Sequence, residues 1–309
     1  MITREKLLRD PEGCGSKYAF LLQRGVVPEF KDKAVVGAPR HIANFAQVPG
    51  SCRVMQATLT VGTGRTCTVG VSAHTPETDT PTSFPIYYLP WAEDQVVRVT
   101  LKPSKHQPVP REPDVFFTDN LQGCMVTVEG PPERPTVYHS NVVSFLGSPA
   151  GDRSVREDLA KIYIETKIIV MEQAYKAMSA QHDKVGESNR KGLLHPKSIN
   201  QHAYQSLLGR PSGEQDERLY MEKIMADQGV KGFSDRGGIV KFEVAKGTVF
   251  GVRSYGFWHF YYQRLLCGSF FRKEETKDPL KPRLVWLYDD WRPLQCREFW
   301  PFGEGSLTL

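Results

Sequence analysis

One cysteine and one histidine in this chain have the types and the spacing that nucleophilic catalysis requires. Cys124 opens a β-prone run at 124–129, and His139 ends a second such run at 134–139. The two runs flank Gly130-Pro131-Pro132-Glu133, and a four-residue loop of this kind typically closes an antiparallel hairpin around a type I turn. The spacing therefore predicts a hairpin that brings a thiol and an imidazole together.

The register of this hairpin decides whether the two groups meet. We expect Glu129 to pair with Arg134, which places Cys124 directly opposite His139. Side chains alternate across a strand, and directly opposed β-carbons lie about 4.5–5.5 Å apart, so a ring nitrogen can reach the thiol. In such a pair the thiolate attacks, and a neighbouring imidazolium lowers the thiol pKa well below its ordinary value of about 8.5.

The residues around the pair fit the same chemistry. Gly123 allows a tight turn before the cysteine, so the backbone N–H groups of Gly123 and Cys124 can converge on a developing oxyanion. His139 also needs a group that orients its second ring nitrogen. The candidates are the backbone carbonyl of Thr118 and the side chains of Asp119, Asn120 and Asn141.

The local sequence resembles a known family of enzymes. Leu121-Gln122-Gly123-Cys124, followed by Val137-Tyr138-His139, resembles the Leu-Ser-Gly-Cys protein-glutamine deamidases, which include the catalytic domain of the cytotoxic necrotizing factors and the Burkholderia lethal factor. The resemblance spans residues 116–139 and departs from the family at Gln122, where serine is usual.

This resemblance implies a function and a role for each matching residue. Cys124 would be the nucleophile, His139 its base, and Thr118 the orienting residue through its backbone carbonyl. The reaction would be deamidation of a protein glutamine, a hydrolase activity that needs no metal or organic cofactor. The family implies a secreted bacterial effector toxin and virulence factor, delivered into the cytosol of a host or competitor cell. Its substrate there would be a target protein such as a small GTPase or a translation factor.

The elements that must position the pair are mostly strands in the first half of the chain and again near its end. β-Propensity and alternation predict strands at 53–61, 66–73, 85–91, 95–101, 238–244, 248–253, 258–266 and 284–288. The first two flank Gly62-Thr63-Gly64-Arg65 and read as a hairpin.

Helical signals occupy the middle of the chain. Apolar residues recur at a period near 3.6 from Leu159 to Met178, and Ser154 with Glu157 has capping-box spacing. A second cap at Ser198 predicts a short helix to Leu208, and residues 214–228 read as a third helix. We therefore expect an α+β fold with a mixed β-sheet or β-sandwich core flanked by helices. Residues 1–309 would form a single α+β catalytic domain, with a helical insertion at about 154–228.

Composition excludes several classes of function. Hydrophobic residues make up 40% and charged residues 24%, which is typical of a soluble globular protein. The net charge of +5 is not concentrated in a basic run, so we expect no nucleic-acid partner. The most apolar stretch, 162–171, is interrupted by two charged residues, so we expect no membrane span. The charged amino terminus does not read as a secretory signal, so we expect any export to use another route. Together with the bacterial setting that the resemblance implies, this predicts synthesis in the bacterial cytoplasm without a signal peptide.

Two alternatives remain open from the sequence. The same thiol–imidazole pair serves cysteine proteases and transglutaminase-like acyl transferases, because all of these enzymes proceed through a thioester. The other alternative is a non-catalytic β-rich adaptor or structural module in which Cys124 and His139 are simply packed.

Overall fold

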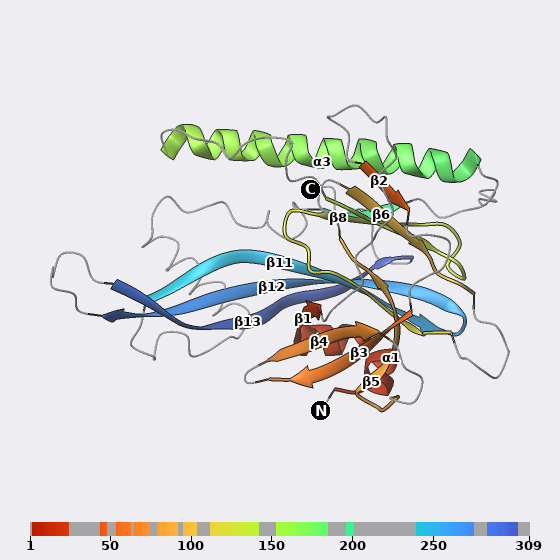
Figure 1. The fold of residues 1–309 in the computed structure, drawn as a ribbon, viewed down its shortest axis with the longest axis horizontal. Coiled ribbons are helices and arrows are strands. Elements are labelled where there is room, and N and C mark those ends of the chain that lie inside the picture. The colour runs from red at the N-terminus through yellow and green to blue at the C-terminus, as the bar shows by residue number, and fades with distance from the viewer. Residues whose placement is uncertain are drawn as a thin grey trace.

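A computed structural model describes residues 2–24, 44–47, 54–62, 65–73, 79–91, 95–103, 112–141, 153–184, 196–200, 239–274 and 283–301. These residues form two β-sheets and three helices (Figure 1), which confirms the predicted α+β class. Residues 201–208 of the short helix predicted to open at Ser198, and all of the predicted helix over 214–228, lie outside the described residues.

The larger sheet, sheet A, has eight strands in the order β1-β4-β3-β5-β7-β11-β12-β13. β1 pairs in parallel with β4, and β5 with β7, whereas the other neighbours are antiparallel. Because β11 pairs with β7, strands from the end of the chain complete a sheet begun in its first half. The strands are β1 (Ala19–Arg24), β3 (Val54–Val61), β4 (Thr66–Ala73), β5 (Ser83–Leu89), β7 (Val115–Thr118), β11 (Ile239–Ser254), β12 (Phe257–Glu274) and β13 (Arg283–Trp300).

The smaller sheet, sheet B, carries the predicted catalytic hairpin. Its five strands run in the order β10-β8-β9-β6-β2, with β8 and β9 antiparallel at its centre. Central strands are covered on both faces, so every residue of β8 and β9 is buried. The strands are β2 (Asn44–Gln47), β6 (Gln95–Thr100), β8 (Met125–Glu129), β9 (Thr136–Ser140) and β10 (Lys197–Ile199).

Three helices cover the outer faces of the sheets. The short helices α1 (Arg4–Arg9) and α2 (Pro11–Lys17) begin at Thr3 and Asp10, whose side chains accept from backbone amides of the first turn. The long helix α3 (Arg153–Lys184) lies across sheet B (Figure 1). No helix among the described residues combines the length and the low polarity that a bilayer crossing demands.

The hydrophobic core between the two sheets surrounds the predicted site. Alternation in β7 sends Phe116 toward sheet B and Phe117 to the opposite face. In β8, Val126 and Val128 point toward sheet A, whereas Met125 packs under α3. Side chains that fill the space between the sheets include Leu89, Phe116, Val126, Val137, Val249, Trp258 and Phe260.

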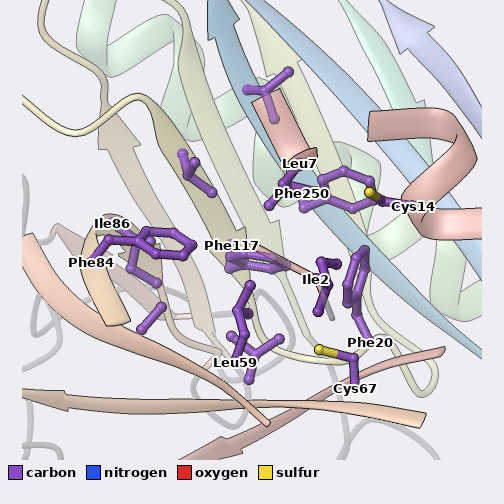
Figure 2. Close-up of a cluster of buried hydrophobic side chains, with 14 of the residues drawn as sticks. Ile2, Leu7, Cys14, Phe20, Leu59, Cys67, Phe84, Ile86, Phe117 and Phe250 are labelled. Carbon is purple, nitrogen blue, oxygen red and sulfur yellow. The ribbon is translucent and has the colours of Figure 1, made fainter. Parts of the chain in front are cut away.

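A second core lies on the other face of sheet A, under α1 and α2. Figure 2 shows Phe20, Phe117 and Phe250 packed with the two helices and with Cys67 of β4. Gln263 of β12 accepts from the Phe20 amide at 2.9 Å and donates to the Tyr18 carbonyl at 2.6 Å. These bonds hold β1 against β12 as well as beside β4, so sheet A curls around this core.

The contact between α2 and β13 gives a testable prediction about packing. A methyl group added at Gly15 would lie 2.3 Å from Cys296 Sγ and 3.0 Å from its Cβ. Because the core is close-packed, Gly15→Ala should lower the free energy of unfolding by about 1–3 kcal/mol, measured by urea denaturation. The same substitution in a Cys296→Ala background should cost clearly less. An equal cost in both backgrounds would locate the strain elsewhere.

Comparison with the predicted elements shows where local sequence signals decide the structure. The hairpin at 53–73 and the long helix are confirmed, although α3 begins at Arg153, so Ser154 lies inside its first turn. The predicted start of the short helix at Ser198 is wrong, because Lys197–Ile199 form β10. That segment pairs with β8, and Ser198 Oγ lies 2.8 Å from Thr127 Oγ1. Pairing with an otherwise open strand edge outweighs the local cap signal.

Candidate active site

The hairpin that carries the predicted pair forms, but its register differs from the predicted one. Val126 pairs with His139 and Glu129 with Thr136, so the expected pairing of Glu129 with Arg134 is wrong. The ladder is displaced by two residues. Cys124 therefore does not lie directly opposite His139.

Two prolines in the turn and one directly after it explain the two-residue displacement of the ladder. The turn is formed by Pro131-Pro132-Glu133-Arg134, in which the Arg134 amide donates to the Pro131 carbonyl at 2.9 Å. Gly130 ends β8 with a φ of +96°, a conformation that favours glycine. Pro135 has no N–H to donate to a ladder, so pairing resumes only at Thr136.

The displacement preserves the feature on which the prediction depended, because a shift of two residues leaves every side chain on its predicted face. Cys124 shares a face with Val126, and His139 lies opposite Val126, so both groups point toward sheet A. They are diagonal neighbours, which are separated by about 7–8 Å, within reach of a ring side chain.

A tight loop presents Cys124 at the start of β8. Gly123 has a φ of +81°, as expected for a glycine that reverses the chain just before the cysteine. Leu121 is held to Gly247 of β11 by two backbone hydrogen bonds of 2.6 and 3.0 Å. A backbone hydrogen bond from Gln122 reaches the Cys124 thiol, while the Gln122 residue itself is exposed.

Thr118 contacts His139 through its hydroxyl group rather than through the predicted backbone carbonyl. Thr118 Oγ1 lies 2.6 Å from His139 Nδ1 and donates to the Leu89 carbonyl at 2.7 Å. A carbonyl can only accept, so the single hydroxyl proton points at Leu89, and the oxygen must accept from Nδ1–H. This contact fixes the tautomer of neutral His139 and leaves Nε2 as its basic nitrogen.

Of the other predicted orienting groups, the Asp119 and Asn120 side chains have different partners. Asp119 accepts from the Tyr88 hydroxyl and, at 2.9 Å, from the Trp91 amide. Asn120 Oδ1 lies 3.0 Å from Thr248 Oγ1 and accepts weakly from the Leu22 amide at 3.5 Å. Both side chains brace the loop that ends at Cys124. Asn141 continues β9 by donating its amide to the Gln95 carbonyl at 3.0 Å.

The expected lowering of the thiol pKa is wrong. Burial raises the pKa of Cys124 to about 11, and the charge of Asp119 raises it further, while the Gln122 backbone and the charge of Lys167 act in the opposite direction. Cys124 is 3% exposed and His139 fully buried, so desolvation of the thiolate is the largest effect. The resting site therefore holds a neutral thiol on the same face of sheet B as His139.

Lys167 is a charged group near the thiol that the sequence did not single out. It lies on the buried side of α3, next to Ile168, which packs in the same cluster as Met125, the residue after Cys124. A lysine within the apolar period of a helix was the available signal. Its significance depends on how α3 docks on sheet B, which no local pattern specifies.

The positive charge of Lys167 yields a prediction about pH dependence. Lys167→Met should raise the pKa of Cys124 above 11, because the thiolate loses a stabilising charge while His139 and Asp119 remain in place. At pH 9 the thiolate fraction falls, so alkylation of Cys124 by iodoacetamide should slow about three- to tenfold. Peptide mass spectrometry gives the rate at this cysteine alone. Lys176→Met, on the exposed side of the same helix, should leave the rate unchanged.

His259 and three other cysteines that the structure describes lie in hydrogen-bonded or packed surroundings. His259 has its Nδ1 3.1 Å from Glu298 Oε1 and a side chain that is 22% exposed. Cys14, Cys67 and Cys296 are buried in the second core, and burial raises the pKa of each thiol. Within the part of the chain that the structure describes, no three His, Cys, Asp or Glu side chains form a metal-binding group.

Comparison with known proteins adds no further constraint. No protein-family model matches the chain, and a search of the curated proteins finds no match.

Proposed function

We propose that this protein is a cysteine-dependent deamidase that converts a glutamine side chain of a target protein to glutamate. Cys124 is the nucleophile, His139 the general base, and Thr118 the residue that orients the base. The observation that carries the proposal is the contact of Thr118 with both Leu89 and His139, since it aligns one tautomer of a histidine on the face that Cys124 shares. Packing alone does not require that alignment.

The first half of the reaction forms a thioester. As Cys124 Sγ attacks the carboxamide carbon, its proton passes to His139 Nε2, and the carbonyl oxygen becomes an oxyanion that the backbone N–H groups of Gly123 and Cys124 stabilise. The C–N bond then breaks, and His139 returns the proton to the departing ammonia. Because the thiol is neutral at rest, proton transfer accompanies attack, and no preformed thiolate is needed.

The second half releases glutamate. A water molecule attacks the thioester carbon while His139 takes its proton, and the C–S bond breaks as that proton returns to the sulfur. The net reaction consumes one glutamine side chain and one water and yields glutamate and ammonia. No redox or metal chemistry enters these steps.

The resemblance at 116–139 supports the biological setting. A bacterial effector toxin of this kind acts on a protein inside a recipient cell, with a small GTPase or a translation factor as the expected class of target. A protein substrate also accounts for the closed site, because Cys124 is 3% exposed. We infer that the free protein opens transiently, so that small reagents reach the thiol slowly, and that target binding favours the open form and brings a recognised glutamine to Cys124.

The direct test compares wild type with Cys124→Ala in cells of a sensitive host. Glutamine-to-glutamate conversion across the proteome, measured by mass spectrometry, should appear with wild type and disappear with Cys124→Ala. The matched control is Cys67→Ala, another buried cysteine in a different core, which should retain conversion if it folds. Chain cleavage would instead identify a protease, and amine incorporation at glutamine a transglutaminase-like transfer.

The burial of both groups favours a second candidate, a non-catalytic adaptor in which Cys124 and His139 are packing residues. The same experiment separates the two. Equal effects of wild type and Cys124→Ala on the host cell, with no conversion of glutamine by either, would support the adaptor and contradict the deamidase.

A further inference from the structure

Asn141 occupies a distinctive place beside the candidate nucleophile. The last ladder pair of the hairpin joins Met125 to Ser140, so one step further along, Cys124 and Asn141 come opposite each other. The hydrogen bond from the Asn141 amide to the Gln95 carbonyl shows that the strand geometry continues to this residue. By alternation, the Asn141 side chain shares a face with His139 and Cys124.

The carboxamide of Asn141 has an unused acceptor. Asn141 is 4% exposed, and its Oδ1 is a buried oxygen with no hydrogen-bond partner in the structure. A buried polar group without a partner is costly, and native proteins rarely keep one without a reason. An orphan acceptor directly across from a nucleophilic thiol is therefore a candidate contact for a ligand.

We propose that Asn141 Oδ1 accepts a hydrogen bond from the NH₂ group of the substrate carboxamide and so selects primary amides. This inference rests on the proposed deamidase function and assigns it a substrate class. A primary amide can donate one N–H to Asn141 while its carbonyl carbon faces Cys124. An ester has no N–H, and the single N–H of a backbone amide belongs to a chain that continues beyond the nitrogen.

The selection follows from the energetics of buried polar groups. A site that pairs a buried acceptor with a substrate N–H discriminates strongly against analogues that lack it, because the acceptor is then left unpaired. Asn141 would thus favour deamidation over proteolysis, two reactions that the thiol and imidazole alone do not distinguish. The role belongs to a substrate-binding residue, and proton transfer remains with His139.

The probes for the test are chloroacetamide and chloroacetone, two alkylating agents of nearly the same shape. Chloroacetamide carries an NH₂ group where chloroacetone carries a methyl group, and both share the carbonyl. The rate of Cys124 alkylation by each is measured by peptide mass spectrometry and divided by the rate for N-acetylcysteine, which removes the difference in intrinsic reactivity. Wild type is compared with Asn141→Leu, which removes the acceptor, and with Asn141→Asp, which keeps it.

In wild type the corrected rates should favour chloroacetamide by about tenfold, the value of one hydrogen bond. Asn141→Leu should abolish this preference, and Asn141→Asp should retain it even if both rates fall. Thermal unfolding should show Asn141→Leu to be at least as stable as wild type, because it removes an unpaired polar atom. That measurement separates loss of recognition from loss of fold.

The outcomes distinguish this inference from the proposed function. Alkylation of Cys124 with the same preference in wild type and Asn141→Leu would overturn the role of Asn141 and leave the deamidase standing. Equal loss of both rates in Asn141→Leu would place Asn141 on the shared carbonyl and also overturn the selection. A Cys124 that neither agent alkylates in the folded protein would contradict both proposals.

Discussion

Thr118→Val is expected to lower the rate of glutamine deamidation by about 10²–10⁴-fold. Valine has nearly the shape of threonine but cannot accept from His139 Nδ1 or donate to the Leu89 carbonyl. The ring then loses the contact that keeps Nε2 basic and aligned. The free energy of unfolding should fall by about 1–3 kcal/mol, because the Leu89 carbonyl and His139 Nδ1 both lose their hydrogen-bond partner.

The measurement is the conversion rate of a target glutamine identified with wild type, followed over a range of pH. Thr118→Ser keeps the hydroxyl and should recover most of the activity, whereas a purely steric role would make serine the worse replacement. The loss should appear in kcat rather than KM, since Thr118 does not touch the substrate. Full activity of Thr118→Val would refute the orienting role.

Glu129→Ala is expected to have the largest effect on stability, with a loss of about 3–5 kcal/mol. Glu129 is a buried carboxylate at the end of β8 that accepts from Tyr138 at 2.7 Å and from Tyr175 at 2.5 Å. Ser179 Oγ lies 3.1 and 3.2 Å from its two oxygens. The substitution removes the shared acceptor of the Tyr138, Tyr175 and Ser179 hydroxyl groups, which lie between sheet B and α3.

Urea denaturation measures this loss, and Glu133→Ala is the matched control, because Glu133 is an exposed glutamate in the turn of the same hairpin. The control should change stability by less than about 0.5 kcal/mol. Glu129→Gln retains one acceptor oxygen and should lie between the two. If Glu129→Ala proved as stable as Glu133→Ala, the carboxylate would not be what ties α3 to sheet B.

Much of the candidate site could be predicted from sequence, because which face of the sheet a side chain occupies changes only when the register is wrong by an odd number of residues. A predicted register that is wrong by two residues still places Cys124 and His139 on the same face of the hairpin. The predicted pairing of Glu129 with Arg134 requires Pro135 to take part in the ladder, and Pro135 has no N–H with which to do so. The family resemblance suggested the backbone carbonyl of Thr118, whereas the atom that contacts His139 is the Thr118 hydroxyl oxygen.

The properties set by tertiary packing could not be predicted. The pKa of Cys124 depends on its desolvation in the space between the two sheets. The effect of the Lys167 charge on that pKa depends on how α3 docks on sheet B. Neither has a local signature. Asn141 was weighed only as a partner of His139, because its position opposite Cys124 follows from the observed register rather than the predicted one.

The bonds between Gln263 and the first strand have a consequence for how the protein is made. The Phe20 amide and its acceptor are 243 residues apart in sequence, so β1 gains this contact only after 243 further residues have been synthesised. Closing so long a loop is slow, which should make the nascent chain wait in a partly open state.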